Sequence, residues 1–444
     1  MDRKRPGCQA PKSLKPAYSK VRPWLGNAIA LKPRYHQYYI LSFNIIPNPH
    51  LPIGAKSMFE VTPLQSENDS QRLGDILCQC FNFAREKVPA YQEGIGIENF
   101  RVVRSNQGIL GGLAIYEMAQ YFGGKGIPTG GIAAVGIAPE CRGQGAARAL
   151  LQGTLQELYA KNVPLSTLYP ATQRLYRAVG YEQAGVRCLW QIPLADLALR
   201  DRVCSVHYIE KPDIFKLNEI YQQFAPRYDG YLDRHLFLWA RILHEEDPFY
   251  AYEVREGDRA VGYIIYQQDR SEAGLTLQIR DWVALTPGAL QTLWTLISDH
   301  RSQVDYCRWY SGTIEPRLLC LPEQTAQIRE SNTWFLRVVN VPQALILRGY
   351  SDGIEGELYF EVQDDVIPQN SGKWVLQVSQ GIATVEKSDR ADLCFHSRGM
   401  AALYAGLYSA QQLAATGLIE GTADAILLAN TLFSANCPNM PDFF

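Results

Sequence analysis

Short apolar runs on either side of a polar turn recur in two stretches of the chain that lie about 150 residues apart. In the first stretch, the apolar runs within residues 100–116 flank a polar turn at Ser105–Gly108. In the second, the runs within residues 252–266 flank a turn at Glu256–Asp258. Short apolar runs separated by a glycine-containing turn are typical of β-hairpins. The pattern therefore predicts the same hairpin twice.

The same order of elements follows each hairpin. A further strand, a proline-containing turn and a helix are predicted within residues 133–159 and again within residues 277–297. Because self-similarity at a fixed spacing indicates repeated structural units, we predict two related domains in tandem. The two turns differ, since Ala138–Arg148 contains a glycine-spaced basic loop and Ala284–Gln291 does not.

The loop of the first copy has the composition of a phosphate site. The start of a helix exposes unpaired N–H groups and the positive end of the helix dipole, which favour a bound pyrophosphate. Gly143, Gly145 and the two alanines that follow let phosphate oxygens approach the backbone. Arg142 and Arg148 add positive charge. The alternative interpretation is a glycine-rich turn that leads into an ordinary helix.

Two other classes of phosphate site do not fit this loop. The chain has no G-x-x-x-x-G-K-[ST] segment, which a P-loop nucleotide triphosphatase requires. Gly143-x-Gly145 continues to Arg148, at a position where a dinucleotide-binding fold needs glycine.

Length and charge narrow the class of partner. A chain of 444 residues is expected to divide into about three domains. Residues 1–57 hold ten lysines and arginines but a single acid, so they carry +9 and the remainder carries −11, for a formal net charge of −2. An acidic body argues against nucleic acid as a partner and suits a cationic substrate.

The basic leader lacks the continuous apolar region of a secretory signal. Its longest apolar stretch, Tyr38–Ile46, is far shorter than the roughly 20 residues that span a bilayer, so no membrane span is expected. We expect residues 1–57 to be a disordered extension, or the result of a start codon assigned too early.

The metal-binding and redox residues are scattered. Of ten cysteines only Cys78 and Cys80 lie close together, and no C-x-x-C pair with matching partners occurs. A reducing compartment, the cytoplasm, is therefore expected. Seven histidines show no ligand spacing, and we expect no metal site.

The segment Val135–Ala147 resembles the acetyl-CoA motif of the GCN5-related N-acetyltransferases (GNATs), R-x-x-G-x-G/A after a splayed strand. The resemblance implies an acetyl-CoA-dependent N-acetyltransferase in which main-chain groups of the strand pair with the pantetheine arm and the loop holds the pyrophosphate. The implied cofactor-binding residues are Val135, Gly136, Ile137, Arg142, Gly143, Gln144, Gly145, Ala146, Ala147, Arg148, Ala171 and Thr172.

The architecture from Met58 to Phe444 is similar to the enhanced intracellular survival (Eis) type of this family. The resemblance implies an α+β fold with tandem GNAT folds, each a mixed central sheet flanked by helices, and then a sterol carrier protein-like α/β domain. We expect the leader to be followed by a catalytic domain at 58–200, a degenerate second copy at 201–334 and the third domain at 335–444, opened by Phe335. The family also suggests a homo-oligomer, a hexamer.

Acetyl transfer to an amine needs a group that accepts the amine proton and one that protonates the departing thiolate. Tyr176 matches the position of the family's general acid, and a phenol with an unperturbed pKa near ~10 stays protonated at neutral pH. The alternative is that Tyr176 only packs, as Tyr181 is expected to do.

The family's base is the carboxylate of the last residue, here Phe444. Two prolines and two terminal aromatic residues in Cys437–Phe444 favour a docked tail. The alternative is that the two phenylalanines pack against the third domain.

The resemblance predicts direct transfer, in a ternary complex, to a primary amine of the aminoglycoside, polyamine or lysine type, either a small molecule or a peptide. Two other functions remain open at this point: a lipid- or sterol-binding carrier, and an acetyl-CoA-binding pseudoenzyme.

Overall fold

The structure is a computed structural model, and it describes residues 59–244, 248–271, 274–435 and 437–444. These residues belong to one compact unit that spans Gly54–Phe444. The leader, for which we expected disorder or a misassigned start, lies outside the described residues. Among the described residues, no helix is both long enough and apolar enough to cross a lipid bilayer.

The first expected hairpin is present and forms part of a large mixed sheet. Strands β2 and β3 pair in antiparallel fashion from Phe100 opposite Ala114 to Ser105 opposite Gly108, as the two apolar runs and their turn predicted. Arg104 of β2 pairs with Asp69 in the first turn of α1, and the Ser66 hydroxyl caps that helix. The elements of this part are β1 (Glu60–Pro63), α1 (Glu67–Phe81), α2 (Val88–Ile95), β2 (Phe100–Ser105), β3 (Gly108–Phe122), β4 (Lys125–Ile137), α3 (Ala146–Ala160), β5 (Leu165–Leu168), α4 (Gln173–Arg177) and β6 (Glu182–Pro193).

The second hairpin forms as expected from β9 and β10, with β11 and α7 after it. The proline at the start of α7 follows Thr286, whose hydroxyl accepts from the Ala289 amide. The elements of this part are β7 (Ser205–Tyr208), α5 (Ile214–Phe224), β8 (Leu232–Asp233), α6 (Leu236–Ile242), β9 (Phe249–Glu256), β10 (Arg259–Ser271), β11 (Gly274–Ala284), α7 (Pro287–Ser298), β12 (Tyr306–Ser311) and β13 (Gln327–Val338).

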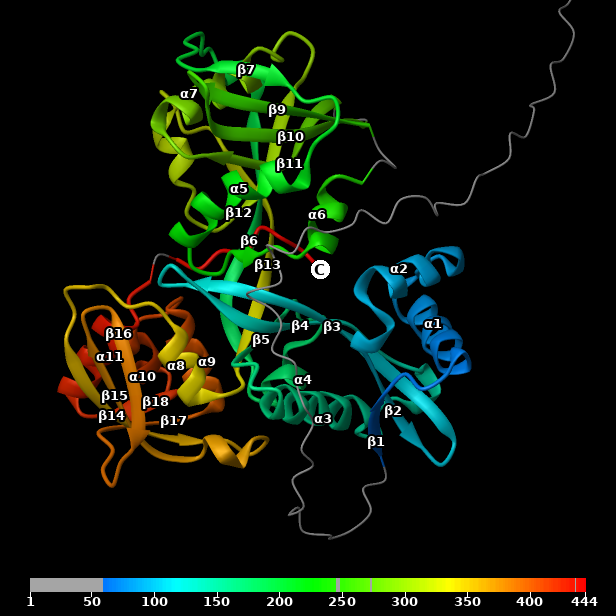
Figure 1. The fold of residues 1–444 in the computed structure, drawn as a ribbon, viewed down its shortest axis with the longest axis vertical. Coiled ribbons are helices and arrows are strands. Elements are labelled where there is room, and N and C mark those ends of the chain that lie inside the picture. Colours follow the sequence, from blue (N-terminus) through cyan, green and yellow to red (C-terminus); the bar gives the residue numbers. More distant parts are fainter. Residues whose placement is uncertain (1–58, 245–247, 272–273, 436) are drawn as a thin grey trace, which may run out of the picture. The chain divides into compact units, whose positions relative to one another are not determined.

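The two copies share one sheet. Among the described residues it has 13 strands in the order β1-β2-β3-β4-β5-β13-β6-β12-β11-β10-β9-β7, with β8 paired to β3 (Figure 1). The expected boundary between residues 334 and 335 falls inside β13, and Phe335 pairs with Leu168 of β5 instead of opening the third domain. Trp334, Phe335 and Leu336 are fully buried, because this strand lies between β5 and β6.

The last part forms a separate five-stranded sheet in the order β16-β15-β14-β17-β18. The expected meander is present, since β14, β15 and β16 pair in succession and antiparallel. The elements are α8 (Val341–Leu347), β14 (Gly356–Gln363), β15 (Gly372–Ser379), β16 (Ile382–Lys387), β17 (Leu393–His396), α9 (Ser397–Ala405), α10 (Ala410–Ala415), β18 (Ile419–Gly421) and α11 (Ala423–Leu432).

A buried ion pair holds this last part to the large sheet. Both side chains of Arg337 on β13 and Asp364 after β14 are fully buried, with Nη2 of the arginine 2.7 and 2.6 Å from the two carboxylate oxygens. The Arg337 guanidinium lowers the pKa of the Asp364 carboxyl against the effect of burial. Because an unpaired charge at such a depth is strongly unfavourable, the pair fixes the last part to β13.

Candidate functional site

Strands β4 and β5 separate in the middle of the large sheet. They pair in parallel fashion only at Thr129–Gly131, opposite Leu165–Thr167, while β4 continues to Ile137 along β3. The register between β3 and β4 shifts near Ala134, which has a φ of +50°. A β-bulge of this kind bends a strand and redirects its main-chain groups. The far end of β4 is thus free of β5 and available to a ligand that forms main-chain hydrogen bonds.

The three strand residues expected to contact a cofactor lie beyond this bulge. Val135 is half-buried, and Gly136 and Ile137 are buried. A Cβ on Gly136 would lie 3.2 Å from Leu77 Cδ2, so glycine lets α1 approach the strand. The Ile137 carbonyl already accepts from Arg142 Nε at 3.1 Å and Cys80 Sγ at 3.4 Å. Arg142 therefore holds the end of the strand, although its side chain remains exposed.

The loop after β4 leaves the start of α3 open. Gly143 and Gly145 have φ of +77° and +92°, a region that L side chains rarely adopt. A Cβ on Gly143 would have no atom within 4 Å, and one on Gly145 would meet only Phe59, at 3.9 Å. Gly145 is the N-cap of α3, and no side chain caps this helix. Conformation and open space, together with uncapped N–H groups, fit a pyrophosphate.

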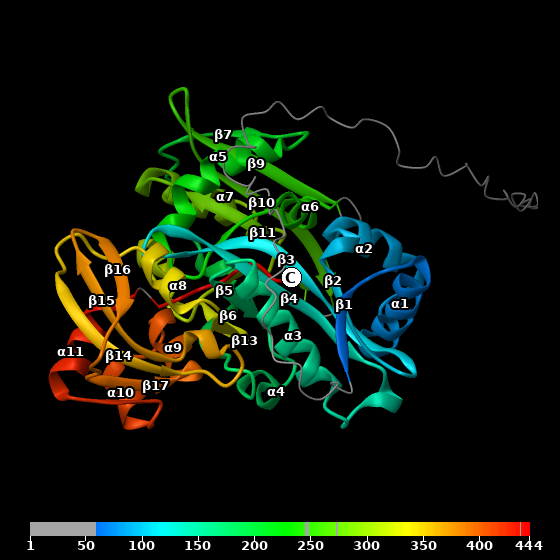
Figure 2. The same ribbon diagram turned by 60° about the horizontal axis from the view of Figure 1, so that its bottom comes forward.

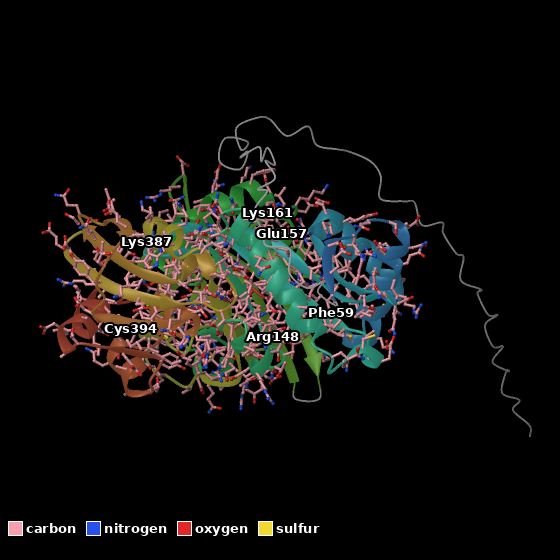
Figure 3. All side chains as sticks on the ribbon, turned by 90° about the horizontal axis from the view of Figure 1, so that it is seen from below. Phe59, Arg148, Glu157, Lys161, Lys387 and Cys394 are labelled. Carbon is pink, nitrogen blue, oxygen red and sulfur yellow. The ribbon has the colours of Figure 1, made fainter. Side chains whose placement is uncertain are left out.

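The remaining loop residues surround this helix start. Ala146 is buried, Ala147 is half-buried, and Gln144 and Arg148 are exposed. Figure 3 shows Arg148 on α3, nearer its start than Glu157 and Lys161, which pair at 2.8 Å. Ala171 and Thr172 are exposed just before α4, and the Thr172 side chain makes no capping hydrogen bond.

Tyr176 lies on α4 with only 5% of its surface exposed. Its ring packs edge-on against Tyr181, with the centroids 6.1 Å apart. The Tyr181 hydroxyl lies 2.7 Å from Ser166 Oγ, which donates to the Gly130 carbonyl at the separation of β4 and β5. Burial raises the pKa of Tyr176 to about 12. Its phenol therefore stays protonated at neutral pH and has a proton to donate there.

The C-terminal tail ends at the same separation, beside β3 and β4 (Figures 1 and 2). Phe444 is 8% exposed, and its ring lies 5.4 Å from Tyr116 of β3 and 6.1 Å from Tyr169. A Cβ on Gly131 would lie 2.9 Å from Phe444 Cε2, so glycine at this position makes room for the ring. The rings of Phe443 and Phe444 pack against Tyr169 and Tyr116 of the first copy, and not against the third domain as the alternative held.

Residues that sequence reasoning did not select hold this tail. The Tyr169 hydroxyl donates to the carbonyls of Met440 and Asp442, at 2.9 and 2.8 Å. Arg187 Nε of β6 donates to the Pro441 carbonyl at 2.7 Å. Among the described residues, no hydrogen bond or ring contact joins Tyr176 to Phe444, so the two candidates are brought to one region but not into direct contact.

Comparison with known proteins gives three matches to domain families. Residues 61–184 and 230–338 each match an acetyltransferase (GNAT) domain, and residues 341–441 match a sterol carrier protein domain. A GCN5-related N-acetyltransferase from Anabaena variabilis is 44% identical in sequence and superposes with a TM-score of 0.84, covering 87% of this chain and 100% of that one. The chain belongs to the GCN5-related N-acetyltransferase family.

Two further relatives of lower identity are also N-acetyltransferases, and one of them is an Eis protein. An uncharacterized N-acetyltransferase from Streptomyces griseus is 26% identical over 72% of this chain and 83% of its own length. The N-acetyltransferase Eis from Mycobacterium tuberculosis is 24% identical over 80% of this chain and 91% of its own length. The expected arrangement of two GNAT domains and a C-terminal sterol carrier protein-like domain is therefore confirmed. The expectation that the chain is an acyltransferase is confirmed as well.

A glycine variant tests the loop of this GNAT chain. Gly145→Ala is expected to raise the Kd for acetyl-CoA about tenfold or more, because alanine lets the free loop relax to a negative φ, binding must restore the positive φ at a cost of about 1–2 kcal/mol, and the methyl group enters the open space. Isothermal titration calorimetry measures the change. The matched control is Gly108→Ala, at a φ of +103° with no atom within 4 Å, in the β2–β3 turn. Equal loss of affinity in both variants would contradict the assignment.

Proposed function

We propose that this chain transfers the acetyl group of acetyl-CoA to a primary amine by direct attack in a ternary complex. The observation that carries the proposal is the free, bulged end of β4 beside the uncapped start of α3. The proposed binding residues are those of the strand, the loop and Ala171–Thr172. The second copy has the Thr286 hydroxyl at the corresponding helix start, where it caps the helix, which supports the first copy as the catalytic one.

The proposed chemistry uses two groups of the chain. Acetyl-CoA would supply the activated acyl group as its thioester. The carboxylate of Phe444 accepts the amine proton through water as the C–N bond forms, and Tyr176 protonates the thiolate as the C–S bond breaks. The buried, neutral phenol of Tyr176 supports its role as the acid. The docked tail supports a defined position for the carboxylate.

An amine screen tests this function. Release of coenzyme A from acetyl-CoA is measured with aminoglycosides, polyamines and lysine peptides, and mass spectrometry identifies the acetylated product. We expect turnover with at least one class of primary amine and none with matched alcohols. Binding of acetyl-CoA without turnover on any amine would favour the pseudoenzyme instead. We further propose that the chain forms a homo-oligomer, which the family suggests is a hexamer. Sedimentation equilibrium measures the mass of the assembly.

A further inference from the structure

The C-terminal tail crosses the second GNAT domain before it reaches the first. The Asn439 amide donates to the Asp229 carbonyl at 2.8 Å. A Cβ on Gly230 would lie 2.9 Å from both Asn439 N and O, and one on Gly312 would lie 3.0 Å from Asn439 Cβ. Both glycines therefore let the backbone of the second domain fit closely around the tail.

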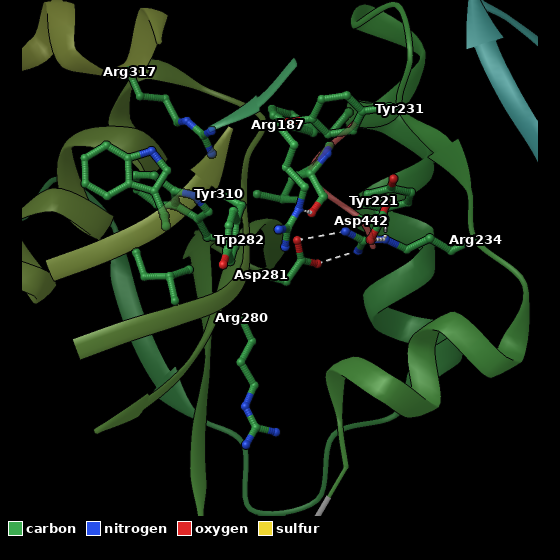
Figure 4. Close-up of a pocket in the computed structure, with 15 residues that line it drawn as sticks. Arg187, Tyr221, Tyr231, Arg234, Arg280, Asp281, Trp282, Tyr310, Arg317 and Asp442 are labelled. Carbon is green, nitrogen blue, oxygen red and sulfur yellow. Dashed lines mark hydrogen bonds and ion pairs between the residues drawn. The ribbon is translucent and has the colours of Figure 1, made fainter. Parts of the chain in front are cut away.

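A buried arginine of the second domain binds the tail two residues before its end. Arg234, between β8 and α6, donates from Nε to both carboxylate oxygens of Asp442, at 3.0 and 3.2 Å. Its Nη1 and Nη2 donate to Asp281 of β11 at 2.5 and 3.0 Å (Figure 4). The side chains of Arg234, Asp281 and Asp442 are only 2%, 10% and 7% exposed.

Two aromatic rings and two carboxylates restrict the orientation of this arginine. Its guanidinium lies 3.9 Å from the ring centroid of Tyr221 and 4.9 Å from that of Trp239. The Tyr263 hydroxyl donates to Asp281 at 2.6 Å, which fixes the second carboxylate. A planar guanidinium that faces two carboxylates and two aromatic rings has its position set by all four.

The charges make the tail contact strongly dependent on the arginine. Burial and the nearby Asp281 raise the pKa of Asp442, and the Arg234 guanidinium opposes this change. Without the arginine, Asp442 would have to be buried without its partner or leave the site. Only Phe443 separates Asp442 from the terminal residue, so displacement of Asp442 moves the carboxylate of Phe444 as well.

We propose that the second GNAT domain serves the first by holding the C-terminal tail, and that Arg234 is the positioning residue that sets where the Phe444 carboxylate lies. The catalytic consequence rests on the proposed function of that carboxylate. The domain without the phosphate loop thereby takes a specific part in the reaction of its neighbour.

Two variants remove the contact from opposite sides, and one provides the control. Arg234→Met removes the cation, while Asp442→Asn removes only the side-chain charge of Asp442 and keeps both the Phe444 carboxylate and the Arg234–Asp281 pair. Arg317→Met removes another buried arginine from the wall of the same pocket. Arg317 bonds to Glu315 and Ser311 and lies over Trp282, and within the described part of the chain it has no hydrogen bond to the tail.

Two measurements distinguish an effect on the position of the tail from an effect on catalysis. Carboxypeptidase A, which removes terminal aromatic residues, reports how often the tail leaves its site. Steady-state kinetics reports kcat and the KM for acetyl-CoA. For Arg234→Met and Asp442→Asn we expect phenylalanine release to rise and kcat to fall, each about tenfold or more, with KM nearly unchanged. Arg317→Met is expected to change neither rate.

The double variant Arg234→Met/Asp442→Asn should be no worse than Arg234→Met alone, because the two residues act through one contact. Unchanged phenylalanine release in both single variants would overturn the positioning role, whatever happens to kcat. Faster release with unchanged kcat would support the tail contact and instead overturn the proposed base. Arg317→Met matching Arg234→Met in both measurements would also overturn the inference.

Discussion

Adding a single glycine after Phe444 is expected to lower kcat about a hundredfold or more, because general base catalysis typically contributes ~10²–10⁴ and needs the base within hydrogen-bond reach. The extension moves the terminal carboxylate by up to ~3.6 Å. The Phe444 ring can keep its contacts with Tyr116 and Gly131, so the tail remains docked. Release of coenzyme A at saturating amine measures the loss.

The control for this extension is Phe444→Leu. It removes the aromatic contact to Tyr116 but leaves the carboxylate at the same point of the chain. We expect it to retain kcat within about tenfold, because the base is still present. If Phe444→Leu lost as much activity as the extension, packing of the ring, and not the carboxylate, would account for the effect.

Tyr176→Phe is expected to lower kcat about a hundredfold or more while the Kd for acetyl-CoA stays the same, because only the proton donor is lost. Burial raises the pKa of this phenol to about 12, so it remains protonated across the usual assay range. The wild-type pH profile should therefore show no loss of kcat from ionisation of Tyr176 at any pH below about 10. Stopped-flow and steady-state assays measure both quantities.

A neighbouring tyrosine provides the matched control. Tyr181→Phe removes a buried hydroxyl that bonds to Ser166, 2.7 Å away, and keeps the ring that packs on Tyr176. We expect lower stability, by about 0.5–1.5 kcal/mol, with little change in kcat. Full activity of Tyr176→Phe would remove that residue as the acid and leave the binding site intact.

Local patterns in the sequence predicted the elements that depend on neighbours in the chain. The hairpins and the loop at Gly143–Gly145 could be predicted because turns and helix starts have their own residue preferences. The loop's glycines do adopt the positive φ that such a site requires. The room that Gly131 leaves for the Phe444 ring was only weakly indicated by the sequence. Glycine within a strand often marks a close approach of another group, but it does not show which group approaches.

Contacts between residues far apart in the sequence could not be predicted from local patterns. Arg234 and Asp442 are 208 residues apart, and neither stands in a motif. Tyr169 was visible beside the predicted acid, but nothing local shows that its hydroxyl bonds to carbonyls 271 and 273 residues further along. The domain boundary expected at Phe335 was also misplaced, because the apolar run that contains Phe335 does not show which of the two sheets it joins.

Because of the position of β13, the strands of the large sheet are not synthesised in the order in which they lie side by side. Thr167 of β5 bonds to Phe335 of β13, which leaves the ribosome 168 residues later. Until then β5 and β6 lack the strand that lies between them, and their exposed edges can pair with other chains. The residues that we propose bind acetyl-CoA are made early, but β13 joins their sheet only after the second domain has been made. Translation of the second domain is thus a period in which the nascent chain depends on protection from aggregation.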